Sequence, residues 1–120
     1  MTQLAFSQDH KPQYTKALTL MDEGKFNEAK IILDELLDQN PERLEILYNV
    51  AYCYFMIGRA DITTNHMRRF FMRNKKDPDA LNLYGLSFEK TGYDDSSIVY
   101  YNKTIEVDKN YYEAYFNRGR

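Results

Sequence analysis

The chain has 120 residues, a formal net charge of −2 and an isoelectric point near 5.7. This is one domain's worth of sequence, without a general attraction for nucleic acid phosphates. The single cysteine excludes an internal disulfide and favours a reducing compartment, so we predict a cytoplasmic protein. The first residues show no basic stretch ahead of an apolar run, and no window approaches the roughly 18 apolar residues that span a bilayer. Neither a secretory signal nor a membrane span is therefore expected.

Residues 1–9 carry no clear period and are predicted to form a flexible tail, whereas residues 10–120 are predicted to form one helical repeat domain. In the first unit a helix is predicted over 11–23, ended by Gly24, which accepts left-handed backbone. A second helix is predicted to begin at Asn27. Its apolar residues recur at three- and four-residue steps and form one buried stripe: Ala29, Ile32, Leu33, Leu36 and Leu37. Pro41 closes the unit and is expected in the first turn of the next helix.

Two further units follow, with helices predicted over 42–57 and 61–74 and then over 78–91 and 95–107. Pro78 lies 37 residues after Pro41, so we predict a shifted loop over 74–77 with Asp77 as the cap of the next helix. The repeats are placed at 10–43, 44–77 and 78–111, and residues 112–120 begin a fourth. This last segment either caps the array or continues into a longer one, and we favour a fragment of a longer array.

A fixed spacing of 34 residues supports this division, since it separates Gly24, Gly58 and Gly92. Three other positions repeat in the same phase. Seven positions before each glycine lies a small residue: Ala17, Ala51 or Gly85. Four positions before it lies a large apolar residue: Leu20, Tyr54 or Phe88. Three positions after it lies a predicted helix cap: Asn27, Asp61 or Asp95. A period of this length with this order of classes is typical of helix–turn–helix arrays.

The pattern resembles the tetratricopeptide repeat. Its segment W-x2-L-G-x2-Y is matched by Leu47-x2-Val50-Ala51-x2-Tyr54 and again by Leu81-x2-Tyr84-Gly85-x2-Phe88. The first unit departs from it, because Gln13 and Lys16 replace two apolar positions. The resemblance covers residues 10–120 and implies an all-α, right-handed superhelical solenoid of antiparallel helix pairs, with three repeats and the first helix of a fourth.

No catalytic constellation is visible in the sequence. A nucleophile with a base, paired carboxylates in a pocket or a metal cluster would be needed, and His10 and His66 have no second ligand at metal-binding spacing. Cys53 falls at a repeat position occupied by Thr19 and Ser87, which predicts a buried small side chain rather than a reactive thiol. We therefore predict a protein that is not an enzyme and needs no cofactor or metal.

In tetratricopeptide arrays the first helix of each pair lines a concave groove, so the resemblance assigns a groove to this chain. Its predicted residues are Leu18, Tyr48, Asn49, Tyr52, Phe55, Asn82, Leu83, Leu86 and Phe116. Because an exposed apolar and aromatic surface marks an interaction site, the set predicts binding of a partner protein or peptide segment. Tyr48, Tyr52 and Leu86 would be its anchors, and Asn49 and Asn82 would hold the partner's backbone. The alternative is that this surface is covered by the amino-terminal tail, a neighbouring repeat or a second copy of the chain.

The best-known groove of this family clamps the acidic carboxyl terminus of a heat-shock chaperone with Lys, Asn and Arg. Here only Asn49 matches, whereas Tyr14, Leu18, Asp79 and Leu83 occupy the other clamp positions. The groove is instead similar to those that hold apolar peptides, as in secretion chaperones. We predict a non-catalytic protein-protein interaction module, a scaffold or chaperone-like adaptor. The alternatives are a self-assembling, homo-oligomeric module and a regulatory arm of a larger enzyme or scaffold. Nucleic acid binding is not expected, because the groove lacks basic positions.

Overall fold

The computed structural model describes residues 10–119, and the predicted tail over 1–9 lies outside this range. Within it the chain forms seven α-helices and no strand. They are α1 (Lys11–Asp22), α2 (Phe26–Gln39), α3 (Leu44–Met56), α4 (Ala60–Phe71), α5 (Pro78–Lys90), α6 (Asp94–Val107) and α7 (Tyr112–Arg118). The all-α prediction is confirmed, and each predicted helix is present. No helix in this range is both long enough and apolar enough to cross a bilayer.

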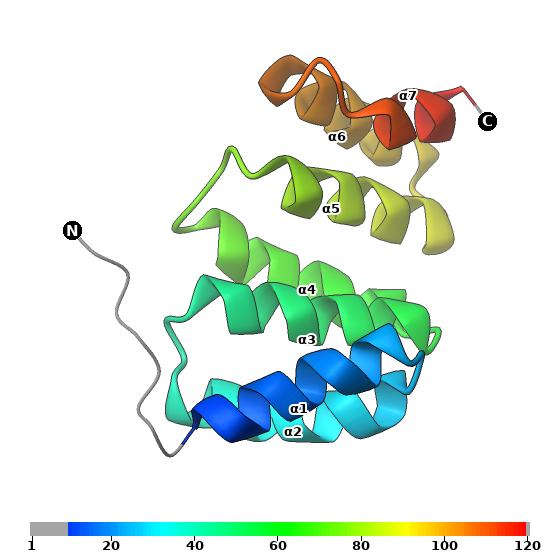
Figure 1. Cartoon of the computed structure of the whole chain (residues 1–120). Helices are drawn as coiled ribbons and strands as arrows, with labels where there is room; N and C mark the ends of the chain where they lie inside the picture. The colour runs from blue at the N-terminus through cyan, green and yellow to red at the C-terminus, as the bar shows by residue number, and fades with distance from the viewer. Residues whose placement is uncertain (1–9, 120) are drawn as a thin grey trace.

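The helices pack in the order in which they occur in the chain, each against the one before and the one after it. Figure 1 shows the pairs α1–α2, α3–α4 and α5–α6 following one another from the bottom of the view to the top, where α7 lies beside α6. The contact between α3 and α5 joins the first helices of neighbouring pairs directly. This arrangement gives an elongated body of 43 × 34 × 23 Å.

The turns inside the pairs are built on the three glycines that set the period. Gly58 has φ = 87°, a conformation that side chains resist, and Gly24 and Gly92 have φ values of 78° and 89°. The Gly58 N–H donates to the Phe55 carbonyl at 3.1 Å, and the Arg59 N–H donates to the Tyr54 carbonyl at 2.8 Å. These two bonds form the Schellman motif that satisfies the last carbonyls of a helix. The predicted turn glycines are thereby confirmed.

The predicted caps Asn27, Asp61 and Asp95 are wrong by two positions. The second helices begin after Lys25, Arg59 and Tyr93, and none of these residues caps its helix through a side chain. The residue after each glycine takes part in the end of the previous helix and is also the N-cap residue of the next helix. No separate position therefore remains for a capping side chain. Asp61 and Asp95 instead lie in the first turn, where a negative charge interacts favourably with the helix dipole.

The two prolines between pairs behave differently. Pro41 lies in a turn closed by the Arg43 N–H and the Asn40 carbonyl at 3.1 Å, so its prediction as a first-turn residue is wrong. Proline is favoured inside such a turn because its φ is already set. At the next junction the prediction is confirmed, since Asp77 accepts a bond from the Ala80 N–H at 3.0 Å and Pro78 opens α5. Helix α4 ends at residue 71, so the three extra residues lengthen the loop over 72–77.

The core alternates small and large residues at repeat-equivalent positions. Ala17 and Ala51 are fully buried, and Gly85, their equivalent in the third repeat, lies beneath the ring of Tyr101. A Cβ atom on Gly85 would lie 2.7 Å from that ring. The repeat positions equivalent to Tyr101 carry Leu33 and Met67, and none of the three side chains is more than 1% exposed. The third repeat thus combines the smallest of the three small residues with the largest of the three large ones.

Many aromatic side chains serve inter-helix packing rather than the groove. Four of them form a cluster that joins α4, α5 and α6: Phe71, Tyr84, Phe88 and Tyr100. The ring centroid of Tyr84 lies 4.4 Å from that of Phe88 and 4.6 Å from that of Tyr100, at the short end of the favourable aromatic distances of about 4.5–7 Å. Cys53 and its repeat equivalent Ser87 are both fully buried, as predicted for Cys53.

Candidate functional site

The predicted groove residues lie on α1, α3, α5 and α7 and differ in their exposure. Six of them are half-buried: Leu18, Tyr48, Asn49, Tyr52, Phe55 and Leu86. Phe116 is 70% exposed, whereas Asn82 and Leu83 are only 3% and 2% exposed. The half-buried members could meet a partner, and the binding role of the set stays a prediction.

The expected exposure of Asn82 and Leu83 is wrong. The Asn82 amide donates to Glu113 Oε1 at 3.2 Å and accepts from Asn117 Nδ2 at 3.4 Å. Helix α7 therefore covers this part of α5 and ties Asn82 into a polar contact between repeats. Leu83 packs into the main hydrophobic core together with Tyr84. Both residues support the surface from below and offer a partner little area.

Helix α3 carries the aromatic centre of the predicted groove. Tyr48 and Tyr52 are stacked at 6.4 Å, and Tyr52 meets Phe26 edge-on at 5.9 Å. Asn49 donates to the Tyr14 hydroxyl at 2.9 Å and so links the first two repeats. These contacts hold the α3 side chains in place before any partner arrives. At the opposite end of α3, Phe55 lines a second cleft of about 490 Å³.

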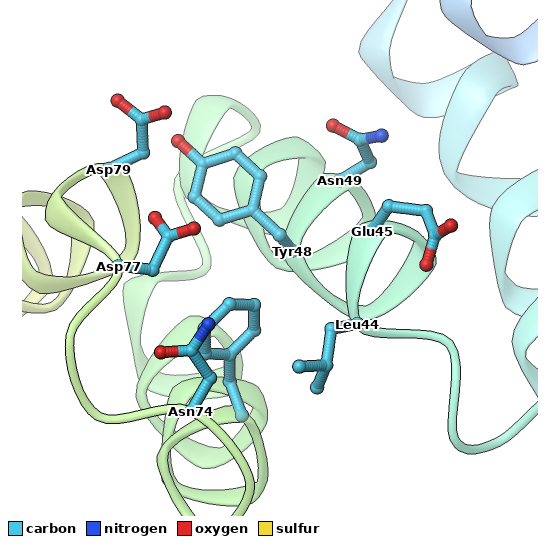
Figure 2. A pocket seen from close by; sticks show the side chains of 8 residues that line it. Leu44, Glu45, Tyr48, Asn49, Asn74, Asp77 and Asp79 are labelled. Carbon is cyan, nitrogen blue, oxygen red and sulfur yellow. The ribbon is translucent and has the colours of Figure 1, made fainter. Parts of the chain in front are cut away.

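A pocket of about 460 Å³ opens beside Tyr48, and we call it the acidic pocket. It is lined by Leu44, Glu45, Tyr48, Asn49, Phe70, Asn74, Asp77 and Asp79. Figure 2 shows the Tyr48 ring in the middle, with its hydroxyl directed toward the side where Asp77 and Asp79 lie, and Glu45 on the other side. The pocket combines an aromatic and aliphatic floor with three carboxylates at its edge.

These carboxylates are held by local contacts. Asp79 accepts from the Tyr111 hydroxyl at 2.7 Å, and Glu45 pairs with Arg43 at 2.8 Å. None of the ion pairs found within residues 10–119 includes Asp77, Asp79 or Glu113. Burial and then the charge of Asp79 raise the pKa of Tyr48 well above its ordinary value. The residues that line the pocket thus include three acids and no Lys or Arg.

This pocket is not predicted from the sequence, although the sequence contains a signal for it. Glu45, Asp79 and Glu113 are spaced by the 34-residue period, and each lies in the first turn of its helix, α3, α5 or α7. We call these three residues the acidic ladder. From the sequence, Asp79 is interpreted only as a departure from the chaperone clamp. Comparing charges along each repeat position would have shown the ladder.

No metal-binding arrangement appears among the described residues. No three or more His, Cys, Asp and Glu side chains in residues 10–119 are placed to hold a metal ion. Burial raises the pKa of the Cys53 thiol to about 11, so the thiolate that a nucleophile requires is scarce near neutral pH. The absence of enzymatic activity stays a prediction.

Comparison with known families identifies the repeats. Two tetratricopeptide repeat profiles match the chain, one over residues 20–61 and the other over residues 78–111. The chain belongs to the tetratricopeptide repeat family. The predicted family is confirmed, and the protein is a repeat module of a class that mediates protein interactions.

Relatives and solved structures agree with this assignment. The photosystem I assembly protein Ycf3 of Prochlorococcus marinus (strain NATL1A) is 32% identical over 82 residues, which cover 66% of this chain and 47% of that protein. The chain thus spans about half the length of the curated relative. The crystal structure of MamA is 25% identical, covers 92% of this chain and 64% of its own, and superposes with a TM-score of 0.85.

A second solved structure of similar fold contains a bound peptide. The first tetratricopeptide repeat domain of Spaghetti (RPAP3), solved with the HSP90 peptide SRMEEVD, has a TM-score of 0.86 and 18% identity, and covers 95% of this chain and 90% of its own. At this identity the likeness shows the shared fold alone.

Proposed function

We propose that this tetratricopeptide module is a non-catalytic adaptor that binds an extended segment of a partner protein along the side formed by α1, α3, α5 and α7. The observation that carries the proposal is the row of half-buried apolar side chains, Leu18, Tyr48, Tyr52, Phe55 and Leu86, on the first helices of consecutive pairs. Such a surface, rigid before binding, costs little ordering on the module's side. The adaptor could act as a scaffold or as a chaperone, and its cytoplasmic location stays a prediction.

The test is the double variant Tyr52→Ala/Leu86→Ala. Peptides selected from a random library on the wild-type chain should bind it with measurable fluorescence anisotropy and lose binding to this variant. A matched control is Ile31→Ala/Met72→Ala, which removes apolar side chains that are 62% and 81% exposed and lie outside the predicted groove. Circular dichroism should show near wild-type helix content in both. Equal binding by wild type and groove variant would refute the groove assignment.

A second candidate function is self-assembly through α7, where Tyr112 and Phe116 are 73% and 70% exposed. Exposed aromatic side chains on one short helix favour a contact with another copy or another chain. Light scattering over a dilution series gives the mass directly. A dimer that becomes monomeric in Tyr112→Ser/Phe116→Ser would support self-assembly, whereas a wild-type monomer at every concentration would exclude it.

A further inference from the structure

The acidic pocket indicates the charge of the partner, which the apolar surface does not. Three carboxylates, Glu45, Asp77 and Asp79, line one pocket together with Tyr48 and Phe70. The guanidinium of Arg43 pairs with Glu45, and the loop that contributes Asn74 and Asp77 also carries the exposed Arg73, Lys75 and Lys76. The lining itself nevertheless carries three acidic residues and no Lys or Arg, and the acidic ladder extends this series to Glu113.

The floor of the pocket suits a long cationic side chain. Tyr48 and Phe70 meet edge-on at 6.5 Å, and Leu44 adds aliphatic surface beside them. Lysine and arginine bury an aliphatic stem against apolar surface while keeping the charge at the tip, and an aromatic face attracts a cation. A volume of about 460 Å³ falls within the range of ligand sites, about 300–1,000 Å³.

From this geometry we infer that the segment bound in the groove is basic, and that the acidic pocket receives one of its lysine or arginine side chains. The inference rests on the proposed groove function and adds the chemistry of the partner. Further basic residues of the segment would follow the acidic ladder from α3 toward α7. An acidic peptide such as SRMEEVD, held by the Spaghetti domain, would be repelled here.

The local contacts explain why the carboxylates are ready for a cation. The Tyr111 hydroxyl fixes Asp79, and the Ala80 N–H fixes Asp77, so neither side chain needs much ordering on binding. Each bond leaves carboxylate lone pairs for a charged donor, because a carboxylate accepts about four hydrogen bonds. Charge-assisted bonds of this kind are roughly twice as strong as neutral ones.

Three fluorescein-labelled peptides test the inference. They share one length and a Leu and Ala framework, and differ only in carrying Lys, Gln or Glu at the same alternate positions. Binding to the full chain is measured by fluorescence anisotropy at low ionic strength, where surface charges are least screened. We expect the Lys peptide to bind about tenfold or more tighter than the Gln peptide, and the Glu peptide to bind most weakly.

A charge-removing variant locates the effect. Glu45→Gln/Asp77→Asn/Asp79→Asn keeps shape, and the introduced Asn can still cap α5. It should bind the Lys peptide no better than the Gln peptide. The matched control removes the same charge from the outer face of α2, where Glu28, Glu35 and Asp38 are exposed. This control, Glu28→Gln/Glu35→Gln/Asp38→Asn, should keep the preference for the Lys peptide.

Each outcome decides something. If all three peptides bind equally and lose binding to Tyr52→Ala/Leu86→Ala, the groove function stands and the basic partner is refuted. If the Lys peptide needs the pocket carboxylates but not Tyr52 and Leu86, the basic partner stands and the wider groove falls. Absence of binding by every peptide, or equal losses in both charge variants, overturns the inference. So does a wild-type dimer that the pocket variant dissociates, because a second copy of the chain would then occupy the pocket.

Discussion

Gly85 offers the sharpest test of how this array is packed. Its position in the 34-residue repeat is occupied by Ala17 and Ala51 in the first two units, so Gly85→Ala restores the residue that the repeat uses elsewhere. Gly85 lies within α5 and has no positive φ. Helix propensity alone therefore predicts that alanine stabilises the chain by about 1 kcal/mol.

The structure predicts the opposite sign. A Cβ atom on Gly85 would lie 2.7 and 2.8 Å from two ring atoms of Tyr101 and 3.2 Å from the Ser97 carbonyl oxygen, against an optimum of about 3.5–4.0 Å for carbon pairs. The ring cannot move freely, because Tyr101 is 1% exposed and its hydroxyl donates to Glu89 at 2.7 Å. Overpacking of this kind costs about 1–3 kcal/mol. After the propensity gain, we expect a net loss of up to about 2 kcal/mol.

The assay is urea unfolding followed by circular dichroism, in two backgrounds. The second repeat carries Ala51 with Met67 where the third carries Gly85 with Tyr101. In the Tyr101→Met background, Gly85→Ala should be neutral or stabilising by up to about 1 kcal/mol, since the ring is gone. The two backgrounds thus form a double-mutant cycle whose coupling energy we expect to be about 1–3 kcal/mol. A stabilising Gly85→Ala in the wild-type background, or a coupling near zero, would refute the packing argument.

Three further predictions concern stability. Thr63→Val should cost about 1–3 kcal/mol, because the buried Thr63 hydroxyl donates to the Ala51 carbonyl at 2.9 Å; Thr63→Ser should recover most of this loss in urea unfolding. Asp77→Ala should cost about 1 kcal/mol through loss of its bond from Ala80, whereas Asp77→Asn keeps the cap and should cost less, as thermal denaturation would show. Stability should begin to fall as the pH rises through 9, because the thiol of Cys53 has an ordinary pKa of 9.0 and burial raises it to about 11. Above pH 10 half-buried tyrosines with raised pKa values, such as Tyr54, add to the loss. Cys53→Ala should therefore reduce the slope between pH 9 and pH 10 in pH-dependent unfolding, and an unchanged slope there would contradict the assignment.

The helical architecture could be predicted from the sequence because its causes are local and repeated. Gly24, Gly58 and Gly92 fix the turns by conformation alone, and their phase survives the longer loop before Pro78. The helix starts after these glycines could not be predicted as well. A helix can start there either with a capping side chain or with a Schellman turn that runs directly into the next helix. The chain adopts the Schellman turn.

The exposed residues of the candidate site could be predicted less well from the sequence. Position within a helix indicates which side chains face the groove, but not which of them the next repeat covers. Asn82 and Leu83 were expected to be exposed for this reason, whereas α7 and the core enclose them. Similarly, the sequence leaves open whether its many aromatic side chains pack between helices or line the groove, and Tyr84 and Tyr100 pack between helices.

The acidic ladder has a structural cause that precedes any function. Glu45, Asp79 and Glu113 each stand in the first turn of a helix, where the dipole favours negative charge by about 0.3–1 kcal/mol. Because α3, α5 and α7 occupy equivalent places in successive repeats, a preference that acts on each helix separately places the three acids in register along the array. Stability and partner charge are therefore coupled in these residues, and their two contributions can be separated by magnitude. Neutralising Glu45 and Asp79 should cost at most about 1 kcal/mol each in unfolding free energy, as surface dipole interactions do, while abolishing the preference for basic peptides. A loss of stability several times larger, with the peptide preference unchanged, would show that the ladder serves the fold alone.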